Sequence, residues 1–449
     1  MIAADPGLSN PGAGGLGERA FLVYRKGKRA NRRRINYRQG SARMYDVMEG
    51  VKVIEVAEHT FAPAAGMMLA DWGADVIKVE RGVGGGDPAR HLAILQRPGQ
   101  KLNAYFEVAN RGKRSIGLDL RRPEGREILL KLVEEADVFI TNLRADARAK
   151  LGIDPADLMA RNPKLIYARA TGYGPKGPMA NDGGFDYPTS WCRSGSAFVQ
   201  TPPNGDPPPM QPGSVGDLTG GATIAGAISA ALFRRERTGK GCIVDHSLYG
   251  MGAYIMTQSI CGASLAGTVM PPQREVPPGA ANAMNRHYKT SDNRWIQICF
   301  LFDAWFPDFA RRIGREDLLA DPRFKDEPSK YANGVALAAE LDKTFATKDY
   351  ETWKKILAGA DGVWAPVQAP GELLSDVQAI ENGIVTPVKT YDGGTYYAAG
   401  SPGQFDEKPP GELRASPAYG QHNEEIVRAL GFSDTQIAEM RADGLLVSA

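Results

Sequence analysis

The stretch "VKVIEVAEHTFAPAAGMMLADWGADVIKVER" (residues 51–81) predicts the fold more directly than any other part of the chain. Its first six residues are mostly β-branched and apolar, which is typical of a short buried strand. Small and apolar residues at helical spacing follow at 60–74, and "DVIKVER" (75–81) indicates a second strand. A strand, a helix and a second strand in this order predict a β-α-β unit that opens a parallel sheet.

The same alternation continues along the chain to about residue 175. Further strands are predicted at 113–120, 137–143 and 164–174, and they alternate with predicted helices at 123–136 and 154–163. Pro123 opens the first of these helices, with acidic residues early and Lys131 later, as the helix dipole favours. We therefore expect an α/β fold with an open, mostly parallel, Rossmann-like sheet.

The chain changes character after residue 175. A proline-rich loop (201–213) precedes an Ala- and Gly-rich helix at 217–237, which we expect to be buried. A hairpin at 288–300 and short amphipathic helices predict a smaller α+β domain, and Ser433 is a candidate N-cap in a terminal helix pair. We predict three parts: a basic, disordered extension at 1–43, a large Rossmann-like domain at 44–270 and 385–449, and a small α+β domain with its linkers at 271–384.

Composition narrows the class of protein. The 449 residues are 43% hydrophobic and 24% charged, as in ordinary globular proteins, and no apolar run reaches the roughly 18 residues of a membrane span. The five histidines are scattered without metal-ligand spacing, so no metal site is predicted. The four cysteines are far apart, which argues against a disulfide framework and favours a reducing, cytoplasmic location. They are Cys192, Cys242, Cys261 and Cys299.

Positive charge is concentrated at the start of the chain. Residues 1–43 hold ten Lys or Arg and two acids, a net +8, so the remainder carries 2 − 8 = −6. Three interpretations stay open: a nucleic-acid-binding arm, an organelle transit peptide, or a disordered extension upstream of a start at Met44 or Met48. The rest of the chain has no basic face with interleaved aromatic residues, so no nucleic-acid partner is expected.

A glycine-rich segment, "RGVGGGDPAR" (81–90), follows the second predicted strand. A dinucleotide fingerprint would follow the first strand and lead into a helix, so the segment does not indicate NAD binding. It is either a flexible loop or a phosphate site flanked by Arg81 and Arg90. No GxSxG elbow occurs at a strand-to-helix turn, which argues against a serine hydrolase.

One carboxylate stands out in "MQPGSVGDLTGGATIAG" (210–226), at the start of the predicted Ala- and Gly-rich helix. Asp217 has glycines on both sides: Gly213, Gly216, Gly220 and Gly221. It could cap the helix, because Asp is a favoured N-cap residue. It could equally be a carboxylate nucleophile near the positive end of the helix dipole, with the glycines leaving room for a bulky substrate. The pattern alone leaves both interpretations open.

Taken together, several motifs resemble the class III coenzyme A transferases, a family that includes formyl-CoA transferase, carnitine CoA-transferase and the 2-methylacyl-CoA racemases. The segments include 48–81, "NRGKRSIGLDLRRPEGREILLKLVEEADVFITNL" (110–143), "VGDLTGGATIAGAISAALFRRERTGKG" (215–241) and "GQHNEEIVRALGFSDTQIAEM" (420–440). The resemblance covers about 48–446. It implies a large Rossmann-like domain built from both chain ends, a smaller inserted domain, and an interlocked homodimer.

The resemblance also implies a reaction and a site. Asp217 matches the nucleophile of the transferases, which forms a covalent aspartyl intermediate while CoA moves from an acyl-CoA to a small carboxylic acid. CoA and acyl-CoA would be substrates, with no permanently bound cofactor. By alignment, the candidate CoA contacts are His59, Thr60, Phe61, Arg81, Leu118, Asn142, Leu143 and Lys150. The candidate substrate pocket is Phe185, Asp186, Tyr187 and Trp191.

Two departures from the family pattern bear on function. The racemases carry an acid/base His in a "GHD" context, whereas this chain has "GFDYP" with Phe185 at that position. This favours transfer over a 2-methylacyl-CoA racemase or acyl-CoA isomerase, which would need another base such as Asp186. The glycine-run loop of many transferases is reduced to Gly279 in "PPGAANAMN" (277–285). The aromatic residues at 185, 187 and 191 predict a medium or bulky apolar acyl group.

Overall fold

The structure is a computed structural model that describes residues 45–92, 94, 99–100, 102–202, 205–269, 282–408 and 411–449. The predicted extension at 1–43 and Gly279 lie outside the described residues. The chain divides into two compact units, Met1–Pro272 with Leu374–Ala449 and Gln273–Leu373. The sequence placed the second boundary at 384, but helix α16 (Val377–Glu381) already belongs to the first unit because it packs against β10 (Val385–Lys389).

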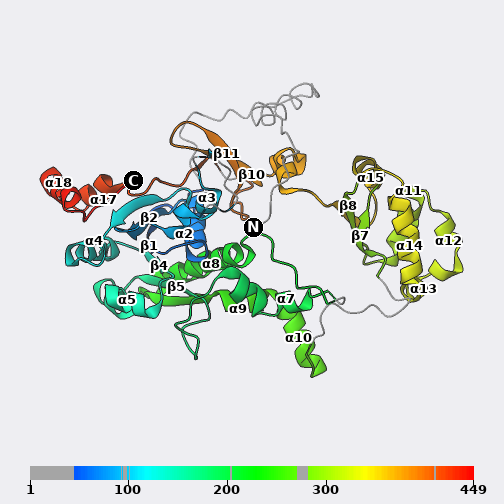
Figure 1. Cartoon of the computed structure of the whole chain (residues 1–449), viewed down its shortest axis with the longest axis horizontal. Helices are drawn as coiled ribbons and strands as arrows, with labels where there is room; N and C mark the ends of the chain where they lie inside the picture. Colours follow the sequence, from blue (N-terminus) through cyan, green and yellow to red (C-terminus); the bar gives the residue numbers. More distant parts are fainter. Residues whose placement is uncertain are drawn as a thin grey trace. The chain divides into compact units, whose positions relative to one another are not determined.

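A six-stranded parallel sheet forms the centre of the first unit (Figure 1). Its strands are β1 (Lys52–Val56), β2 (Asp75–Arg81), β3 (Arg114–Leu118), β4 (Val138–Thr141), β5 (Ile166–Thr171) and β6 (Cys242–Ser247). Their spatial order is β3-β2-β1-β4-β5-β6, and every pairing is parallel. This confirms the predicted α/β class. The chain reverses its direction of progress across the sheet between β1 and β4, and ligands bind outside the carboxyl ends of strands at such switch points.

Both faces of the sheet are covered, which explains why β1, β2 and β4 are almost completely buried. Successive side chains of a strand point to opposite faces. Ile54 and Val56 of β1 therefore join one core, while Val53 and Ala57 join the other. The first core is completed by α4 (Pro123–Glu134), α6 (Pro155–Arg161), α17 (Asn423–Ala429) and α18 (Asp434–Ala442). The second is completed mainly by α2 (Phe61–Asp71) and α8 (Val215–Thr238).

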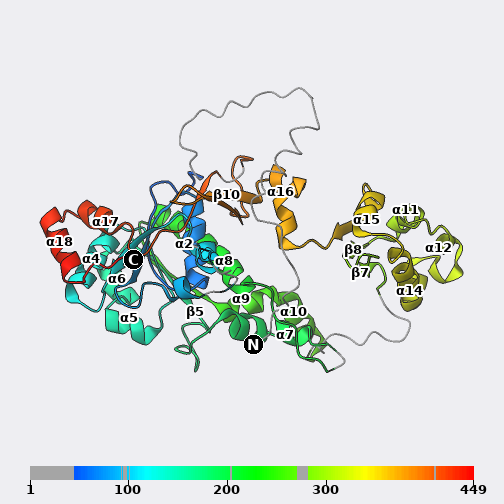
Figure 2. The ribbon, with the colours of Figure 1, turned by 45° about the horizontal axis from the view of Figure 1, so that its top comes forward.

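Helices α2 and α8 lie side by side, in blue and green in Figures 1 and 2. Two glycines of α8 permit this close packing. A Cβ atom on Gly220 would lie 2.3 Å from the Phe61 ring, and one on Gly221 would lie 2.5 Å from the Ala64 Cβ. The sequence offered these glycines as room for a substrate; the structure uses them for helix packing.

Helix α8 is the one helix, among those of the described residues, that is long and apolar enough to cross a membrane by length and composition. Half of its most apolar 18-residue stretch is buried inside the first unit, where the helix packs on α2 and on the sheet. The predicted burial therefore holds for one face of the helix, as in the core helix of a folded domain.

Smaller sheets complete the two units. In the first unit, β10 pairs with β11 (Thr395–Ala399) and β12 (Leu413–Arg414). In the second, β7 (Asn285–Lys289), β8 (Trp295–Cys299) and β9 (Val363–Pro366) form an antiparallel sheet, which includes the predicted hairpin. The helices of the second unit include α11 (Phe306–Arg312), α12 (Asp317–Ala320), α13 (Glu327–Ala332), α14 (Gly334–Phe345) and α15 (Tyr350–Leu357). Ser433 caps α18 as predicted, accepting the Gln436 N–H.

Candidate active site

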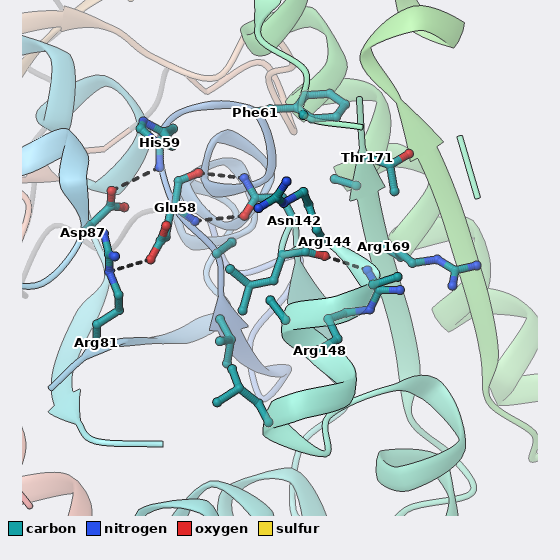
Figure 3. Close-up of a pocket in the computed structure, with 18 of the residues that line it drawn as sticks. Glu58, His59, Phe61, Arg81, Asp87, Asn142, Arg144, Arg148, Arg169 and Thr171 are labelled. Atoms are coloured by element: carbon teal, nitrogen blue, oxygen red, sulfur yellow. Dashed lines mark hydrogen bonds and ion pairs between the residues drawn. The ribbon is translucent and has the colours of Figure 1, made fainter. Parts of the chain in front are cut away.

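A cavity of about 750 Å³ opens at the carboxyl ends of the parallel strands of the first unit. Residues that end or directly follow each of the six strands line it: Val56, Arg81, Leu118, Asn142, Thr171 and Leu248. Figure 3 shows part of this wall, with side chains from several strand ends turned toward one space. The position is the one expected for a ligand crevice at a topological switch point.

The loop between β1 and α2 forms one wall of the cavity and is held by side chains from neighbouring strands (Figure 3). Asn142, after β4, accepts the Glu58 N–H at 3.0 Å and donates to the Glu58 carbonyl at 2.7 Å. Arg81, at the end of β2, pairs with the Glu58 carboxylate at 2.8 Å. His59, the residue after Glu58, has φ of +64°. This left-handed backbone conformation is unfavourable for a non-glycine residue and persists only where surrounding contacts hold it.

Arginines are concentrated on the cavity wall: Arg81, Arg121, Arg144, Arg148 and Arg169. Arg148 is bound by Asp154 at 2.9 Å and by the Leu143 carbonyl at 2.6 Å, and Arg169 pairs with Asp245 at 2.7 Å. The guanidinium of Arg144 is exposed and has no hydrogen bond or ion pair to other described residues. Several guanidinium groups around one opening suit a ligand that carries phosphates.

Asp217 lies in the first turn of α8, lines the cavity and is only 9% exposed. Its carboxylate makes no hydrogen bond or ion pair to the part of the chain that the structure describes. Burial, with a smaller contribution from the negative charge of Asp186, raises the pKa of Asp217 to about 7. The N-cap position belongs to Ser214, so the interpretation of Asp217 as the helix cap is wrong.

Asp186 takes the capping role instead. Its Oδ2 accepts the N–H groups of Gly216 at 3.1 Å and Asp217 at 3.3 Å, and the Gln211 amide at 2.6 Å, while Ser190 donates to Oδ1. Gly216 permits this approach, because a Cβ atom there would lie 2.2 Å from Asp186 Oδ1. A carboxylate from 31 residues earlier thus satisfies the helix N-terminus and leaves the Asp217 carboxylate available.

The structure brings most of the predicted site residues together. Those that line the cavity are His59, Phe61, Arg81, Leu118, Asn142, Leu143, Phe185 and Asp217. Those that do not are Thr60, Lys150, Asp186, Tyr187 and Trp191. Lys150 is exposed on α5 (Ala145–Leu151), and Thr60 is fully buried before α2. The indole of Trp191 donates to the Pro209 carbonyl at 3.1 Å, so the predicted aromatic pocket is reduced to Phe185.

The sequence reasoning missed other cavity residues: Glu58, Asp87, Tyr105, Arg144, Arg148 and Arg169. Glu58 and Arg144 lie next to the carboxyl ends of predicted parallel strands, and that position was a usable signal. Arg169 lies inside its predicted strand and had no such signal. Tyr105 had no such signal, because it comes from α3 (Ala104–Asn110). Burial raises the pKa of Tyr105, which keeps its hydroxyl protonated. The described residues contain no group of three His, Cys, Asp or Glu that could hold a metal ion.

Comparison with known proteins identifies the family of the chain. The model of CoA-transferase family III matches residues 48–423. The chain is 33% identical to an (R)-2-hydroxy-4-methylpentanoate CoA-transferase from Clostridioides difficile, over 87% of this chain and 97% of that protein. It is 32% identical to a cinnamoyl-CoA:phenyllactate CoA-transferase from Clostridium sporogenes, over 89% and 97%. The crystal structure of a CAIB/BAIF family protein from Brucella suis matches with a TM-score of 0.74 and 30% identity, over 85% and 99%. The chain belongs to CoA-transferase family III, a family of enzymes.

Proposed function

We propose that the protein moves coenzyme A from an acyl-CoA donor to an organic carboxylate through a covalent intermediate on Asp217. The observation that carries this proposal is the state of Asp217: a nearly buried carboxylate, without a partner among the described residues, facing a cavity. A carboxylate with a raised pKa is more basic and more nucleophilic once ionised than an ordinary surface carboxylate. The names of the relatives support the same class of reaction.

The reaction divides one difficult exchange into four acyl-transfer steps. The Asp217 carboxylate attacks the donor thioester, which forms an acyl–aspartyl anhydride and releases CoA thiolate. The thiolate attacks the aspartyl carbonyl, which gives an aspartyl–CoA thioester and frees the donor acid. The acceptor carboxylate attacks this thioester and forms a second anhydride, again with loss of thiolate. The thiolate then takes the acceptor acyl group, and the Asp217 carboxylate is restored.

The cavity wall suits the remainder of the CoA molecule. Arg81 and Arg144 would contact phosphate groups, because both guanidinium groups line the opening. Leu118 and Leu143 would border the adenine. Leu118 also belongs to the core below, so its backbone position is fixed by packing. Replacing Arg144 with Ala would then weaken CoA binding while leaving the fold unchanged.

Phe185 supports a bulky apolar acyl group. Its ring is 62% exposed, lines the cavity and meets the His59 ring edge-on, with centroids 5.5 Å apart. The two named relatives act on branched or aromatic acids, which agrees with such a pocket. Comparing kcat/KM for branched and aromatic acids with that for formate and oxalate tests this. A preference for the smallest acids would contradict it.

We also infer a homodimer in the cytoplasm that acts without a nucleic acid or a membrane. The exposed surface of helix α10 (Thr257–Ala266) supports the dimer. None of its residues is buried, and the exposed apolar side chains of Ile260 and Leu265 would be covered by a second subunit. Mass measurement by light scattering tests the dimer. Deletion of residues 1–43 should leave full activity; loss of activity would instead give that segment a functional role.

An acyl-CoA racemase or isomerase is the alternative function. Phe185 cannot transfer a proton, and the carboxylate of Asp186 is engaged by the N-terminus of α8, so neither serves as the second base. Incubation of a 2-methylacyl-CoA in deuterium oxide without an acceptor acid separates the two functions. Deuterium entering the α-position without an acceptor acid would favour isomerisation. No deuterium incorporation, together with movement of CoA only when an acceptor acid is added, would favour transfer.

The decisive experiment traps the intermediate. The protein is incubated with a panel of acyl-CoA donors, quenched with hydroxylamine or borohydride, and the peptide that contains Asp217 is analysed by mass spectrometry. Modification of Asp217 is expected with productive donors and should be absent in Asp217→Asn. Asp182→Asn is the matched control, because Asp182 is an exposed carboxylate on the same cavity wall. An unmodified Asp217 during turnover would contradict the mechanism.

A further inference from the structure

A network of buried charges lies next to the cavity, and the proposed reaction does not use it. Glu55 of β1, Lys78 of β2 and Lys113 before β3 are all fully or almost fully buried. Glu55 binds Lys78 at 3.1 Å and Lys113 at 2.7 Å. Buried ion pairs seldom add net stability compared with apolar packing, so this network calls for a role besides stability.

The two lysines are similar in burial and in their shared partner, but they hold different parts of the backbone. The ammonium group of Lys113 donates to the Pro63 carbonyl at 2.8 Å, inside the first turn of α2. The ammonium group of Lys78 donates to the Ala57 carbonyl at 2.8 Å, in the loop that forms the cavity wall. Of the two lysines, Lys78 is therefore the one that contacts this loop.

Asp87 connects Lys78 to His59, because it contacts both residues. Asp87 Oδ2 pairs with Lys78 at 2.9 Å, and Oδ1 accepts the His59 N–H at 3.1 Å and the Ala89 N–H at 2.9 Å. The Asp87 N–H in turn donates to Glu80 at 3.0 Å, so Asp87 cannot shift without breaking several bonds. The dashed line between Asp87 and His59 in Figure 3 marks the last contact in the series from Glu55 through Lys78 and Asp87 to His59.

His59, the last residue in this series of contacts, has a backbone conformation that its neighbours must hold in place. His59 has a left-handed backbone, and its ring meets Phe185 in the cavity. If the His59 N–H lost its acceptor, the loop could return to an ordinary backbone conformation and the ring would leave Phe185. A small displacement of a wall residue is enough to change ligand binding and turnover substantially.

We propose that Lys78 and Asp87 are positioning residues, which hold the loop at 57–59 in the shape that the acyl-CoA cavity requires. This inference rests on the proposed function for the identity of the ligand. It predicts that two equally buried lysines differ in their effect on CoA binding, although each contributes to the same ionic network. A purely structural network would show no such difference.

The test compares Lys78→Met with the matched control Lys113→Met, by thermal unfolding, calorimetric binding of CoA, and steady-state kinetics. Both variants should lose thermal stability. Lys78→Met should weaken CoA binding and raise KM by about tenfold or more, whereas Lys113→Met should leave both within about twofold of wild type. Equal changes in binding for equal losses of stability would overturn the proposal.

A second pair keeps the test valid if Lys78→Met does not fold. Asp87→Ala removes the acceptor of the His59 N–H, and Asp87→Asn retains an oxygen in its place. CoA binding should weaken most in Asp87→Ala. It should weaken less in Asp87→Asn, whose amide oxygen still accepts the His59 N–H although its NH2 group cannot pair with the Lys78 ammonium; weakening to the same degree in both would overturn the proposal. If the wild-type protein bound no CoA at all, the proposed function would fail with it. Normal wild-type binding with no difference among the variants would refute positioning alone.

Discussion

Glu55 and Asp217 are two buried carboxylates of the first unit with opposite surroundings. Glu55 is fully buried between the ammonium groups of Lys78 and Lys113. Asp217 is nearly as buried but has no cationic partner among the described residues, and burial raises its pKa to about 7. The Glu55 carboxylate is thus held by its two lysines, whereas the Asp217 carboxylate remains available for reaction. Available charges of this kind occur at functional sites, where they reduce the stability of the fold.

Removing the charge of Asp217 should have the largest effect. Asp217→Asn should lower the rate of CoA transfer at least about a thousandfold, because an amide cannot form the anhydride. The assay is transfer between a CoA thioester and a carboxylate. Turnover close to that of wild type would contradict the nucleophile assignment.

The same variant should be more stable than wild type at pH 8. The folded pKa of about 7 lies above the unfolded value, so ionisation destabilises the fold. This penalty is absent below about pH 4, grows as the pH rises to about 7, and is complete above it. Asp217→Asn should therefore gain about 1–3 kcal/mol in free energy of unfolding at pH 8 and nothing at pH 4. Denaturant unfolding at both pH values checks this.

Removing the charge of Glu55 should act on stability. Glu55→Gln leaves Lys113 buried without its carboxylate and should cost about 3–5 kcal/mol at pH 7. Burial already lowers the pKa of Lys113 to about 8, so the lysine can lose its proton and the deficit should shrink at pH 9. Glu135→Gln is the control, because the Glu135–Lys52 pair is exposed and should contribute less than about 1 kcal/mol. Equal deficits in the two variants would remove the distinction.

A methyl group tests how tightly the Glu55 network is enclosed. In Gly66→Ala, the Cβ atom would lie 2.0 Å from Glu55 Oε2 and 3.2 Å from the Lys113 side chain, so about 1–3 kcal/mol should be lost. Gly226→Ala, in the middle of α8, meets no atom within 4 Å and should gain up to about 1 kcal/mol. Chemical denaturation of both variants measures the difference. A neutral Gly66→Ala would show that the network has room to rearrange.

The smallest expected effect is on the pH dependence of the reaction. The nucleophile must be ionised, so kcat/KM should fall as the pH drops below about 7. The negative charge of Asp186 contributes to the raised pKa of Asp217, so Asp186→Asn should move the profile to lower pH by up to about one unit. The amide oxygen can still accept from the N-terminus of α8. Asp182→Asn should leave the profile in place, and an identical shift there would point to a general charge effect.

Local patterns in the sequence predicted most of the architecture. The β1–α2–β2 unit follows from two apolar runs separated by a helical spacing, and the cap at Ser433 depends only on Gln436 three residues later. His59, Arg81 and Asn142 could be predicted for the site because they follow predicted strands or match a family motif. Tyr105 could not, because only the packing of α3 brings it to the cavity.

Sequence patterns were enough to predict the alternation of strands and helices, the parallel sheet, the family, and the presence of Asp217 at the start of an Ala- and Gly-rich helix. Whether Asp217 caps that helix or faces a cavity depended on the folded chain, because Asp186, 31 residues earlier, supplies the cap. The tertiary structure also decided that Lys78 and Lys113 are buried, although lysines are usually exposed. The side-chain periodicity of a helix or strand can be read from neighbouring residues, whereas burial and the pairing of charges depend on residues that meet only after folding.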